Sequence, residues 1–244
     1  MRVVAVMPTY RRKKMTLATV LALRAQSLPP EAIVVVGSER GDIEAANEAG
    51  AYYVDYPNEM LSWKIQAGID YARGFFPDAL MLCGSDDFFS RNWIEALAPK
   101  TGEFDMVGHG ICHLLLLDGG VPEVWRLNVY AGTSRSREPI GTGRLFSRRI
   151  LDKLDWKLYP EGKPRGCDAI CHAQVLKAGG SIHRYEGKEV NLLCPKGGWE
   201  QINGWEAYAG ARSKSEIGDP RRWLNRYFPG VAEFLLRMRK DGKS

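Results

Sequence analysis

Two adjacent carboxylates, Asp86 and Asp87, follow the apolar run 79–83 after the turn residues Gly84 and Ser85. A short apolar run bounded by turn residues is typical of a buried strand, and open α/β sheets bind ligands beyond the carboxyl ends of such strands. Carboxylate oxygens at that place suit Mg²⁺ or Mn²⁺, which commonly bridges one or two carboxylates to substrate phosphates. The same residues also fit a solvated turn, because Ser, Asp and Gly favour turns.

A second carboxylate, Asp168, lies at the start of a helix that the sequence predicts over residues 167–178, ending at Gly179 and Gly180. An acid at a helix start is favoured by capping and by the helix dipole without any catalytic role. His172 follows four residues later, so the two side chains could pair on one helix face. From these residues alone, both a structural and a chemical role for Asp168 stay open.

The elements that position the first pair of carboxylates alternate in type along residues 1–85. Strands are predicted at 3–7, 32–36, 51–54 and 79–83. Helices are predicted from the basic run 11–14 to Leu28, at 42–49 with Asp42 as N-cap, and at 61–72. Such alternation indicates a mostly parallel sheet of the nucleotide-binding kind. Neither a dinucleotide-binding fingerprint nor a P-loop follows the first strand, so phosphates are not held in either of those ways.

After Asp87 the pattern changes. We predict a short helix at 93–97, a hairpin formed by 106–117 and 124–127 with Gly119-Gly120 as its turn, a loop over 132–143, a strand end and helix over 145–154, strands at 181–185 and 190–193, and a helix at 231–239. No internal repeat or long linker interrupts this order. One compact catalytic unit followed by a tail is therefore the predicted organisation.

Composition restricts the class of protein. The chain of 244 residues is 45% hydrophobic and 26% charged, as expected of a soluble globular protein. No run approaches the roughly 18 apolar residues of a membrane span, and Pro8 interrupts an opening too short for a signal peptide. The five cysteines are an odd number without a tight framework, which argues for reduced thiols. We expect a cytoplasmic protein without a transmembrane segment.

The charge of the chain is concentrated at its C-terminal end. Residues 211–244 hold nine Lys/Arg and four Asp/Glu, and this excess of five equals the net charge of +5 for the whole chain. A basic tail can contact nucleic acid, an anionic membrane or another anionic surface. A solvated helix face explains the same residues equally well.

Four motifs, in order along the chain, resemble those of glycosyltransferase family 2, whose members have the GT-A fold. Pro8-Thr9-Tyr10 resembles the Pro-Thr-Tyr-Asn-Arg opening of that family, and residues 65–69 resemble its Leu-Asn-x-Gly-Ile helix. Residues 82–87 resemble its Leu-Asp-Ala-Asp-Asp metal motif, and 166–168 resemble the Glu-Asp motif that carries its catalytic base. Together the motifs cover residues 3 to about 185.

The resemblance implies an α/β fold with a GT-A-type, Rossmann-like sheet, mostly parallel and mixed at one edge, continuous with an acceptor-binding half. Residues 1–210 would form this domain, with the donor-binding half in 1–98 and the acceptor-binding half in 99–210. Residues 211–244 would form a basic, partly helical tail. It implies a metal-dependent glycosyltransferase that moves a sugar from a nucleotide-diphosphate sugar, by default a UDP-sugar, to a hydroxyl of a carbohydrate or envelope intermediate.

Three alternatives stay open beside this function. The basic tail, with Arg135 and Arg137, also suits a phage-type glycosyltransferase that modifies hydroxylated bases of DNA, and such binding would weaken steeply with salt. A sugar nucleotidyltransferase has a similar half-sheet, but the Gly-rich Arg/Lys signature of that class is replaced here by Pro8-Thr9-Tyr10. A non-catalytic sugar-nucleotide binder would bind the donor without turnover.

Position by position, the resemblance also implies roles for individual residues. The residues implied in nucleotide-sugar binding are Pro8, Thr9, Tyr10, Ser38, Gln66, Ser85 and Asp86, with the Tyr10 ring near the base and Gln66 facing the sugar. The residues implied in binding Mn²⁺ or Mg²⁺ are Asp86, Asp87 and His183. Asp168 would be the catalytic base, which removes the acceptor proton during attack at the anomeric carbon, with hexose transfer and inversion of configuration.

This sequence departs from the family pattern at three places. Gly84 stands where the family usually has the first Asp of its metal motif. Residues 35–36 are valines where an Asp often reads the uracil edge, a role for which Glu39 or Asp42 could substitute. Cys167 replaces the Glu that usually precedes the base. We therefore expect fewer fixed metal ligands than usual and treat UDP as a default.

Overall fold

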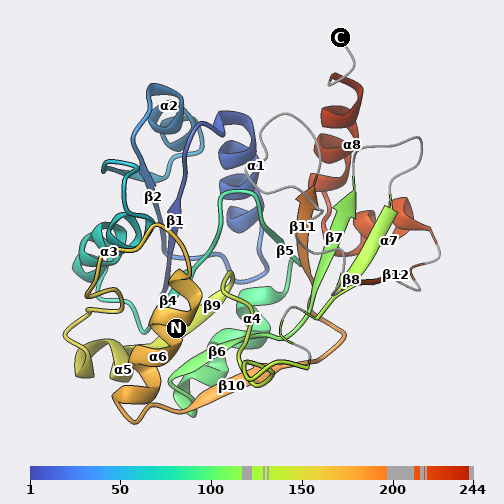
Figure 1. The fold of residues 1–244 in the computed structure, drawn as a ribbon. Coiled ribbons are helices and arrows are strands. Elements are labelled where there is room, and N and C mark those ends of the chain that lie inside the picture. The colour runs from blue at the N-terminus through green and yellow to red at the C-terminus, as the bar shows by residue number, and fades with distance from the viewer. Residues whose placement is uncertain are drawn as a thin grey trace.

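The computed structural model describes residues 1–116, 123–128, 130, 132–196, 212–214, 217 and 219–241. Its strands form two sheets, one of seven strands and one of five, with helices packed around them (Figure 1). The predicted fold class, an α/β fold with a mostly parallel, mixed central sheet, is confirmed.

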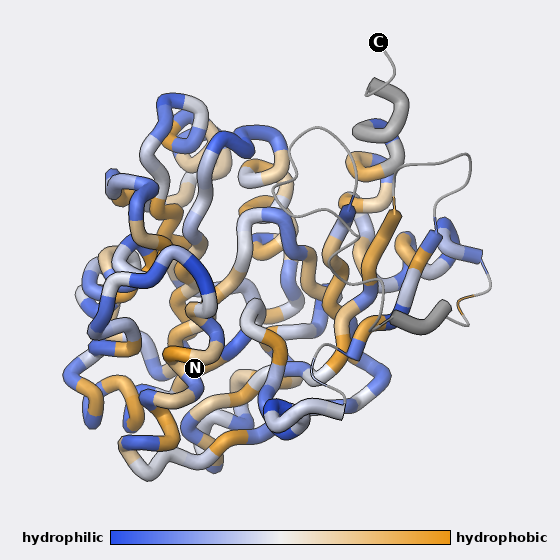
Figure 2. Tube along the Cα trace, in the orientation of Figure 1, coloured by the Kyte–Doolittle hydropathy of each residue, from blue (hydrophilic) through white to orange (hydrophobic). Residues whose placement is uncertain are grey.

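The seven-stranded sheet contains the strands predicted from the first half of the sequence. Its order is β10 (Ile182–Tyr185), β6 (Met106–His109), β9 (Arg144–Ser147), β4 (Ala79–Leu82), β1 (Val3–Pro8), β2 (Ala32–Gly37) and β3 (Tyr52–Asp55). All neighbouring strands pair in parallel except β9, which is antiparallel to both β4 and β6. The central strands are continuous apolar runs because helices cover both faces of the sheet, and they are orange in Figure 2.

Helices cover the two faces of this sheet because strand side chains alternate between the faces. Ala5 and Met7 of β1 pack with Val20 of α1 (Lys13–Arg24), whereas Val6 packs on the other face with residues of α3 (Leu61–Ala72). A Cβ at Gly68 of α3 would lie 2.5 Å from Val6, so glycine permits this close approach of helix to sheet. The remaining helices of this part are α2 (Arg40–Glu48), η1 (Arg73–Phe75), α4 (Trp93–Leu97), η2 (Ala98–Gly102), α5 (Arg148–Lys153) and α6 (Cys167–Lys177).

The start of α2 differs from the prediction. The helix begins at Arg40 and its N-cap is Glu39, so the prediction of Asp42 as N-cap was wrong. Asp42 is instead buried inside the first turn, where its Oδ2 accepts hydrogen bonds from the backbone N–H groups of Ser38 and Glu39 at 3.2 and 3.3 Å. A carboxylate in the first turn can satisfy these otherwise unpaired donors from inside the helix.

The five-stranded sheet has the order β12 (Arg212–Lys214), β8 (Glu123–Leu127), β7 (Cys112–Leu116), β11 (Leu192–Lys196) and β5 (Phe88–Phe89). The antiparallel pair β7–β8 is the predicted hairpin, and its predicted turn at Gly119-Gly120 lies outside the described residues. The single strand predicted over 106–117 was wrong. It is two strands, because the chain leaves the large sheet after β6 and enters the smaller sheet at β7.

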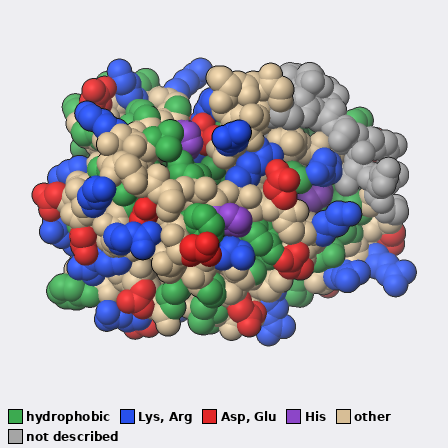
Figure 3. Space-filling view, turned by 90° about the horizontal axis from the view of Figure 1, so that it is seen from below, with side chains coloured by type: hydrophobic (Ala, Val, Ile, Leu, Met, Phe, Trp, Pro, Cys, Tyr) green, Lys and Arg blue, Asp and Glu red, His purple; other side chains and the backbone are tan. Residues whose placement is uncertain are grey.

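The C-terminal helices α7 (Pro220–Tyr227) and α8 (Val231–Asp241) pack against the rest of the molecule. Leu224 and Leu235 share a buried apolar cluster with Met15 of α1 and Leu193 of β11, and α8 lies beside α1 in Figure 1. Four arginines of these helices have described side chains, and all four are exposed (Arg221, Arg222, Arg226 and Arg237). On the face drawn in Figure 3, basic and acidic side chains are interspersed. None of the helices in the described ranges is long and apolar enough to cross a bilayer.

Candidate active site

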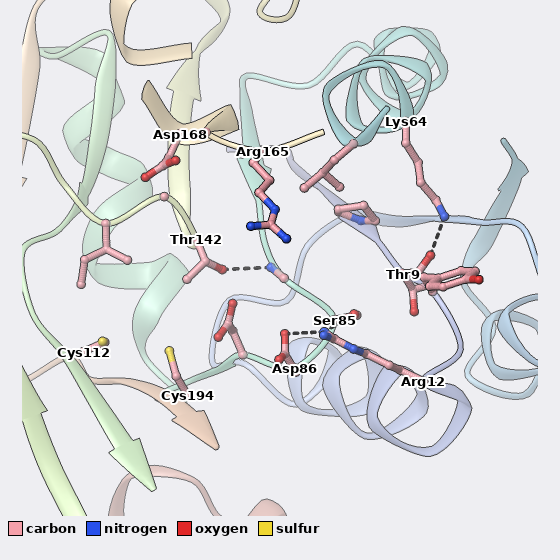
Figure 4. Close-up of a pocket in the computed structure, with 18 of the residues that line it drawn as sticks. Thr9, Arg12, Lys64, Ser85, Asp86, Cys112, Thr142, Arg165, Asp168 and Cys194 are labelled. Atoms are coloured by element: carbon pink, nitrogen blue, oxygen red, sulfur yellow. Dashed lines mark hydrogen bonds and ion pairs between the residues drawn. The ribbon is translucent and has the colours of Figure 1, made fainter. Parts of the chain in front are cut away.

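A cavity of about 730 Å³ opens beyond the carboxyl ends of β1 and β4. Its lining brings together three segments that the sequence singles out, at Thr9 and Tyr10, at Asp86 and Asp87, and at Asp168 (Figure 4). The segments at Thr9 and at Asp86 come from strand ends of the large sheet, while residues of β7, β8 and β11 line the opposite side. Parallel strands place their carboxyl ends at one edge of the sheet, which is why segments distant in sequence meet here.

The segment after β1 places an aromatic ring among cations. The Tyr10 ring centroid lies 4.8 Å from the Arg11 guanidinium and 5.8 Å from Lys64 Nζ. Lys64 is buried, and its Nζ donates to the Thr9 carbonyl at 2.6 Å and to Asn58 Oδ1 at 3.1 Å. Burial lowers the pKa of Lys64. Sequence reasoning missed Lys64, because a lysine in an amphipathic helix is normally exposed.

Asp86 is held from the neighbouring helix. Arg12 Nη1 lies 2.8 Å from Asp86 Oδ1, and the two side chains are only 9% and 14% exposed. The same Arg12 nitrogen lies 3.4 Å from Ser85 Oγ, so the N-cap residue of α1 is tied to the loop after β4. Asp86 Oδ2 has no hydrogen bond within the part of the chain that the structure describes. Its second oxygen is therefore available to a ligand, and Arg12 is a site residue that the sequence did not reveal.

Asp87 lies deeper and in a different environment. Burial and the neighbouring charge of Asp86 raise the pKa of Asp87, and this outweighs the opposing effects of Lys196, Cys194 and Thr142. Thr142 Oγ1 also accepts a hydrogen bond from the Gly84 N–H at 2.9 Å. The loop before β9 therefore contacts both the backbone at Gly84 and the carboxylate of Asp87.

The absence of a side chain at residue 84 has a steric reason. A Cβ at Gly84 would lie 2.3 Å from Asp87 Oδ2 and 3.2 Å from its Cγ. The family's first Asp could not occupy this place unless Asp87 moved.

Gly84→Ala is therefore expected to displace the Asp87 carboxylate and to destabilise the fold by roughly 1 kcal/mol, the lower end of the cost of inserting a methyl group where a neighbour must move. Gly102→Ala is the matched control, because nothing lies within 4 Å of a Cβ at that position. Urea unfolding of both variants measures the difference. Equal free energies of unfolding for the two variants would show that Asp87 turns aside without cost.

Asp168 lies at the start of α6 and points toward the cavity (Figure 4). The Tyr130 hydroxyl and Arg135 Nη2, the latter at 3.0 Å, both donate to its Oδ2. Burial raises the pKa of Asp168, but the hydrogen bond from Tyr130 and the charges of Arg144 and Arg135 outweigh it, so the pKa lies below its usual value. A Cβ at Gly141 would lie 2.6 Å from Asp168 Cβ. The loop can approach the start of α6 this closely because residue 141 is a glycine.

Three residues of the predicted site do not line the cavity. Gln66 Nε2 donates to the Trp156 carbonyl at 2.7 Å and its Oε1 accepts from the Tyr159 N–H at 3.0 Å, so its amide joins α3 to the segment after α5. Ser38 follows β2, outside the lining residues. His183 lies in β10, where its ring stacks on Phe104. In the sheet β10 is three strands from β4, a separation of roughly 14 Å at the usual strand spacing.

The two carboxylates after β4 fit a hard cation that is held jointly with a substrate. They are oxygen donors that line the cavity, and Mg²⁺ is commonly bound by one or two carboxylates together with substrate phosphates. Among the described residues there is no cluster of three or more His, Cys, Asp or Glu side chains that could hold a metal without a substrate. The fit is therefore to a metal that arrives with, or is completed by, a phosphate ligand.

The sequence profile of glycosyl transferase family 2 matches residues 4–111. This confirms the resemblance for the part of the chain that contains Tyr10, Asp86 and Asp87, whereas Asp168 lies beyond the matched residues. No curated protein sequence matches the chain.

Several solved structures share the fold at low sequence identity. TarS from S. aureus has a TM-score of 0.57 and 15% identity, over 80% of this chain and 37% of that chain. TarS 1–349 in complex with UDP-GlcNAc has a TM-score of 0.52 and 13% identity, over 97% and 70% of the two chains. Glucosyl-3-phosphoglycerate synthase from Mycobacterium tuberculosis, in complex with Mn²⁺, UDP and glucosyl-3-phosphoglycerate, has a TM-score of 0.52 and 11% identity. The match covers 97% of this chain and 78% of that chain.

These likenesses show the fold and no more. The chain spans 37% and 60% of the first two TarS structures that it matches. With the family profile, they confirm a GT-A glycosyltransferase fold for this chain.

Proposed function

We propose that this protein is a glycosyltransferase that moves a sugar from a UDP-sugar to an acceptor hydroxyl. The observation that carries the proposal is the single cavity shared by Tyr10, by the carboxylates Asp86 and Asp87, and by Asp168. Two fold relatives have been crystallised with UDP, which supports a uridine nucleotide as the donor.

The donor end of the cavity suits a nucleotide diphosphate. We propose that the Tyr10 ring lies against the base and that Thr9, Pro8 and Ser85 frame the ribose and phosphates. Arg165 supports this assignment, because its guanidinium points into the cavity and has no ion pair within the described residues (Figure 4). A cation placed there stabilises the negative charge that grows on the departing diphosphate.

Asp86 and Asp87 would hold the divalent cation, Mn²⁺ or Mg²⁺, on the donor phosphates. Such a cation, when bound, stabilises the charge of the leaving diphosphate. Arg12 holds Oδ1 of Asp86, so the other oxygen, Oδ2, is the one offered to the ligand. His183 is not included in this proposed set, because β10 places it away from the cavity.

At the acceptor end, Asp168 would act as the base. The acceptor O–H bond breaks as its oxygen bonds to the anomeric carbon, the proton passes to the Asp168 carboxylate, and the sugar–phosphate bond breaks toward the diphosphate. One base is sufficient for this direct displacement, which inverts the anomeric configuration. We propose a carbohydrate or envelope intermediate as the acceptor, and no described contact favours nucleic acid over it, because α7 and α8 turn their apolar side inward as ordinary amphipathic helices do.

The test is a screen of UDP-, GDP- and TDP-sugar hydrolysis with Mn²⁺ or Mg²⁺, which needs no acceptor. We expect slow, metal-dependent release of UDP from at least one UDP-sugar. Asp86→Asn should lower this rate at least 10-fold, the lower end of the effect of weakening a metal's ligand environment. Asp70→Asn is the matched control, because Asp70 pairs with Lys157 outside the cavity.

Three results would contradict the proposal. If a UDP-sugar binds but is not turned over with any of the acceptors in a glycan panel, nor hydrolysed without one, the result would favour a sugar-nucleotide binder. Formation of a nucleotide sugar from a nucleoside triphosphate and a free sugar would favour a nucleotidyltransferase. Full activity in Asp86→Asn would show that the metal and donor assignments are wrong.

A further inference from the structure

Two donors converge on one oxygen of the Asp168 carboxylate. The Tyr130 hydroxyl donates to Oδ2, and Arg135 Nη2 donates both to the same Oδ2 and to the Tyr130 hydroxyl oxygen, at 3.0 Å each. The Arg135 guanidinium also lies 4.1 Å from the centroid of the Tyr130 ring. Asp168 Oδ1 has no hydrogen bond within the described part of the chain. Among the described residues, the carboxylate is thus held at one oxygen and has no partner at the other.

A second set of contacts fixes Arg135 and the backbone of Asp168. Glu138, only 2% exposed, accepts from Arg135 Nε at 2.6 Å and Nη2 at 2.7 Å. Glu138 also accepts from Arg144 Nη2 at 2.8 Å, and Arg144 Nη1 donates to the Asp168 carbonyl at 2.6 Å. The side chain and the backbone of Asp168 are therefore each held by an arginine, and one buried glutamate joins these two arginines. Such a bidentate arrangement restricts Arg135 to one orientation.

We infer that Tyr130 and Arg135 are positioning residues for the base, which hold Oδ2 of Asp168 and leave Oδ1 to receive the acceptor proton. This inference rests on the proposed function, in which Asp168 is the base. If Oδ2 were free as well, the carboxylate could rotate, and either oxygen could meet the acceptor or turn away from it. Because one oxygen is already held, the base is oriented before the acceptor binds, and little further entropy is lost in the reaction.

The same contacts set the pH range in which the base is ionised. An opposite charge within 4–6 Å and a hydrogen bond to the carboxylate both favour its ionised form. The other titratable or charged groups around Asp168 are Glu138 and Arg144 from the loop and β9, and Cys167, Cys171 and His172 from its own helix. Burial lowers the pKa of His172, the histidine among them, and its ring lies 3.9 Å from Glu138 rather than on the Asp168 carboxylate.

The experiment compares pH profiles of kcat/KM for the intact protein and its variants, using whichever UDP-sugar is turned over. The acidic limb of such a profile reports the ionisation of essential groups in the free enzyme, here Asp168 together with Asp87, whose raised pKa is common to the intact protein and every variant. In Tyr130→Phe and in Arg135→Gln we expect this limb to move to higher pH by about one unit, because each change removes a group that stabilises the ionised carboxylate. Arg149→Gln is the matched control, since Arg149 forms an Arg–Asp pair at 2.8 Å with Asp105, away from the cavity. His172→Gln controls for the titration of that histidine, and the limb should stay in place in both control variants.

A second measurement needs no substrate. The carboxyl carbon of Asp168, assigned by its loss in Asp168→Asn, can be titrated by ¹³C NMR, and its pKa should rise in the same two variants. If the limb and the NMR pKa stay where they are while activity falls equally at all pH values, Tyr130 and Arg135 only support the fold and the inference is overturned. If Asp168→Asn keeps full activity, the proposed base is wrong, and that result is distinguishable because the NMR titration still shows whether these two residues set the pKa of Asp168.

Discussion

Asp168→Asn is expected to lower kcat for sugar transfer by about 10²–10⁴-fold, the usual contribution of a general base. An asparagine keeps the shape of the side chain and can still accept the hydrogen bonds of Tyr130 and Arg135 through its oxygen. It cannot take the acceptor proton at neutral pH. The loss should therefore appear in the chemical step and leave the fold intact.

The measurement separates the two ends of the cavity. UDP affinity, measured by calorimetry, should stay within a few-fold of the wild-type value, because the proposed donor site lies at the segments after β1 and β4, away from Asp168. Asp152→Asn provides the control for removal of one carboxylate, since Asp152 pairs with Arg148 and is 51% exposed. If transfer by Asp168→Asn equals that of Asp152→Asn, another group takes the proton, whereas the donor assignment is unaffected.

Glu138→Ala is expected to destabilise the protein by roughly 3–5 kcal/mol, the cost of removing one partner of a buried ion pair. Arg144 is 0% exposed, and without Glu138 its guanidinium would keep its charge in a buried environment with only carbonyl and thiol partners. Arg135 would lose its bidentate partner at the same time. Because these arginines hold Asp168, activity should fall further than the folded fraction does.

Chemical denaturation checks this expectation. The double variant Glu138→Ala/Arg144→Met should recover part of the lost stability, because it removes the uncompensated charge as well. Glu233→Ala breaks an exposed pair with Arg237, both side chains being more than three-quarters exposed, and should change the stability little. A loss below about 1 kcal/mol in Glu138→Ala would mean that water or another side chain compensates Arg144 and that the network does not position the base.

The amino-acid sequence by itself determined the strands and helices of residues 1–98 and the place of the two carboxylates after β4. Apolar runs such as those of β1, β2 and β4 are local patterns, and they form buried strands wherever helices can cover them. Once these strands lie in parallel, Asp86 and Asp87 must emerge at the ligand-binding edge. The fold class and the resemblance to family 2 follow from these short-range signals.

Only the tertiary structure decided which charges meet at the site. Arg12 and Asp86 are 74 positions apart, Lys64 and Thr9 are 55 apart, and Arg135 and Asp168 are 33 apart. The periodicity of a sequence does not predict such pairs, because they depend on how loops approach one another across the edge of a sheet. Tertiary packing likewise divided residues 106–117 between two sheets.

The opposite outcome holds for Gln66 and His183, whose sequence positions suggested a ligand. The amide of Gln66 forms hydrogen bonds with two backbone groups of the segment after α5. His183 stacks on Phe104 at the β10 edge of the sheet. A motif indicates which element carries a residue, and this much the sequence determined. Whether the side chain faces the cavity depends on which polar groups of other segments it must satisfy, because buried donors and acceptors are costly to leave unpaired. That competition is resolved only in the folded molecule.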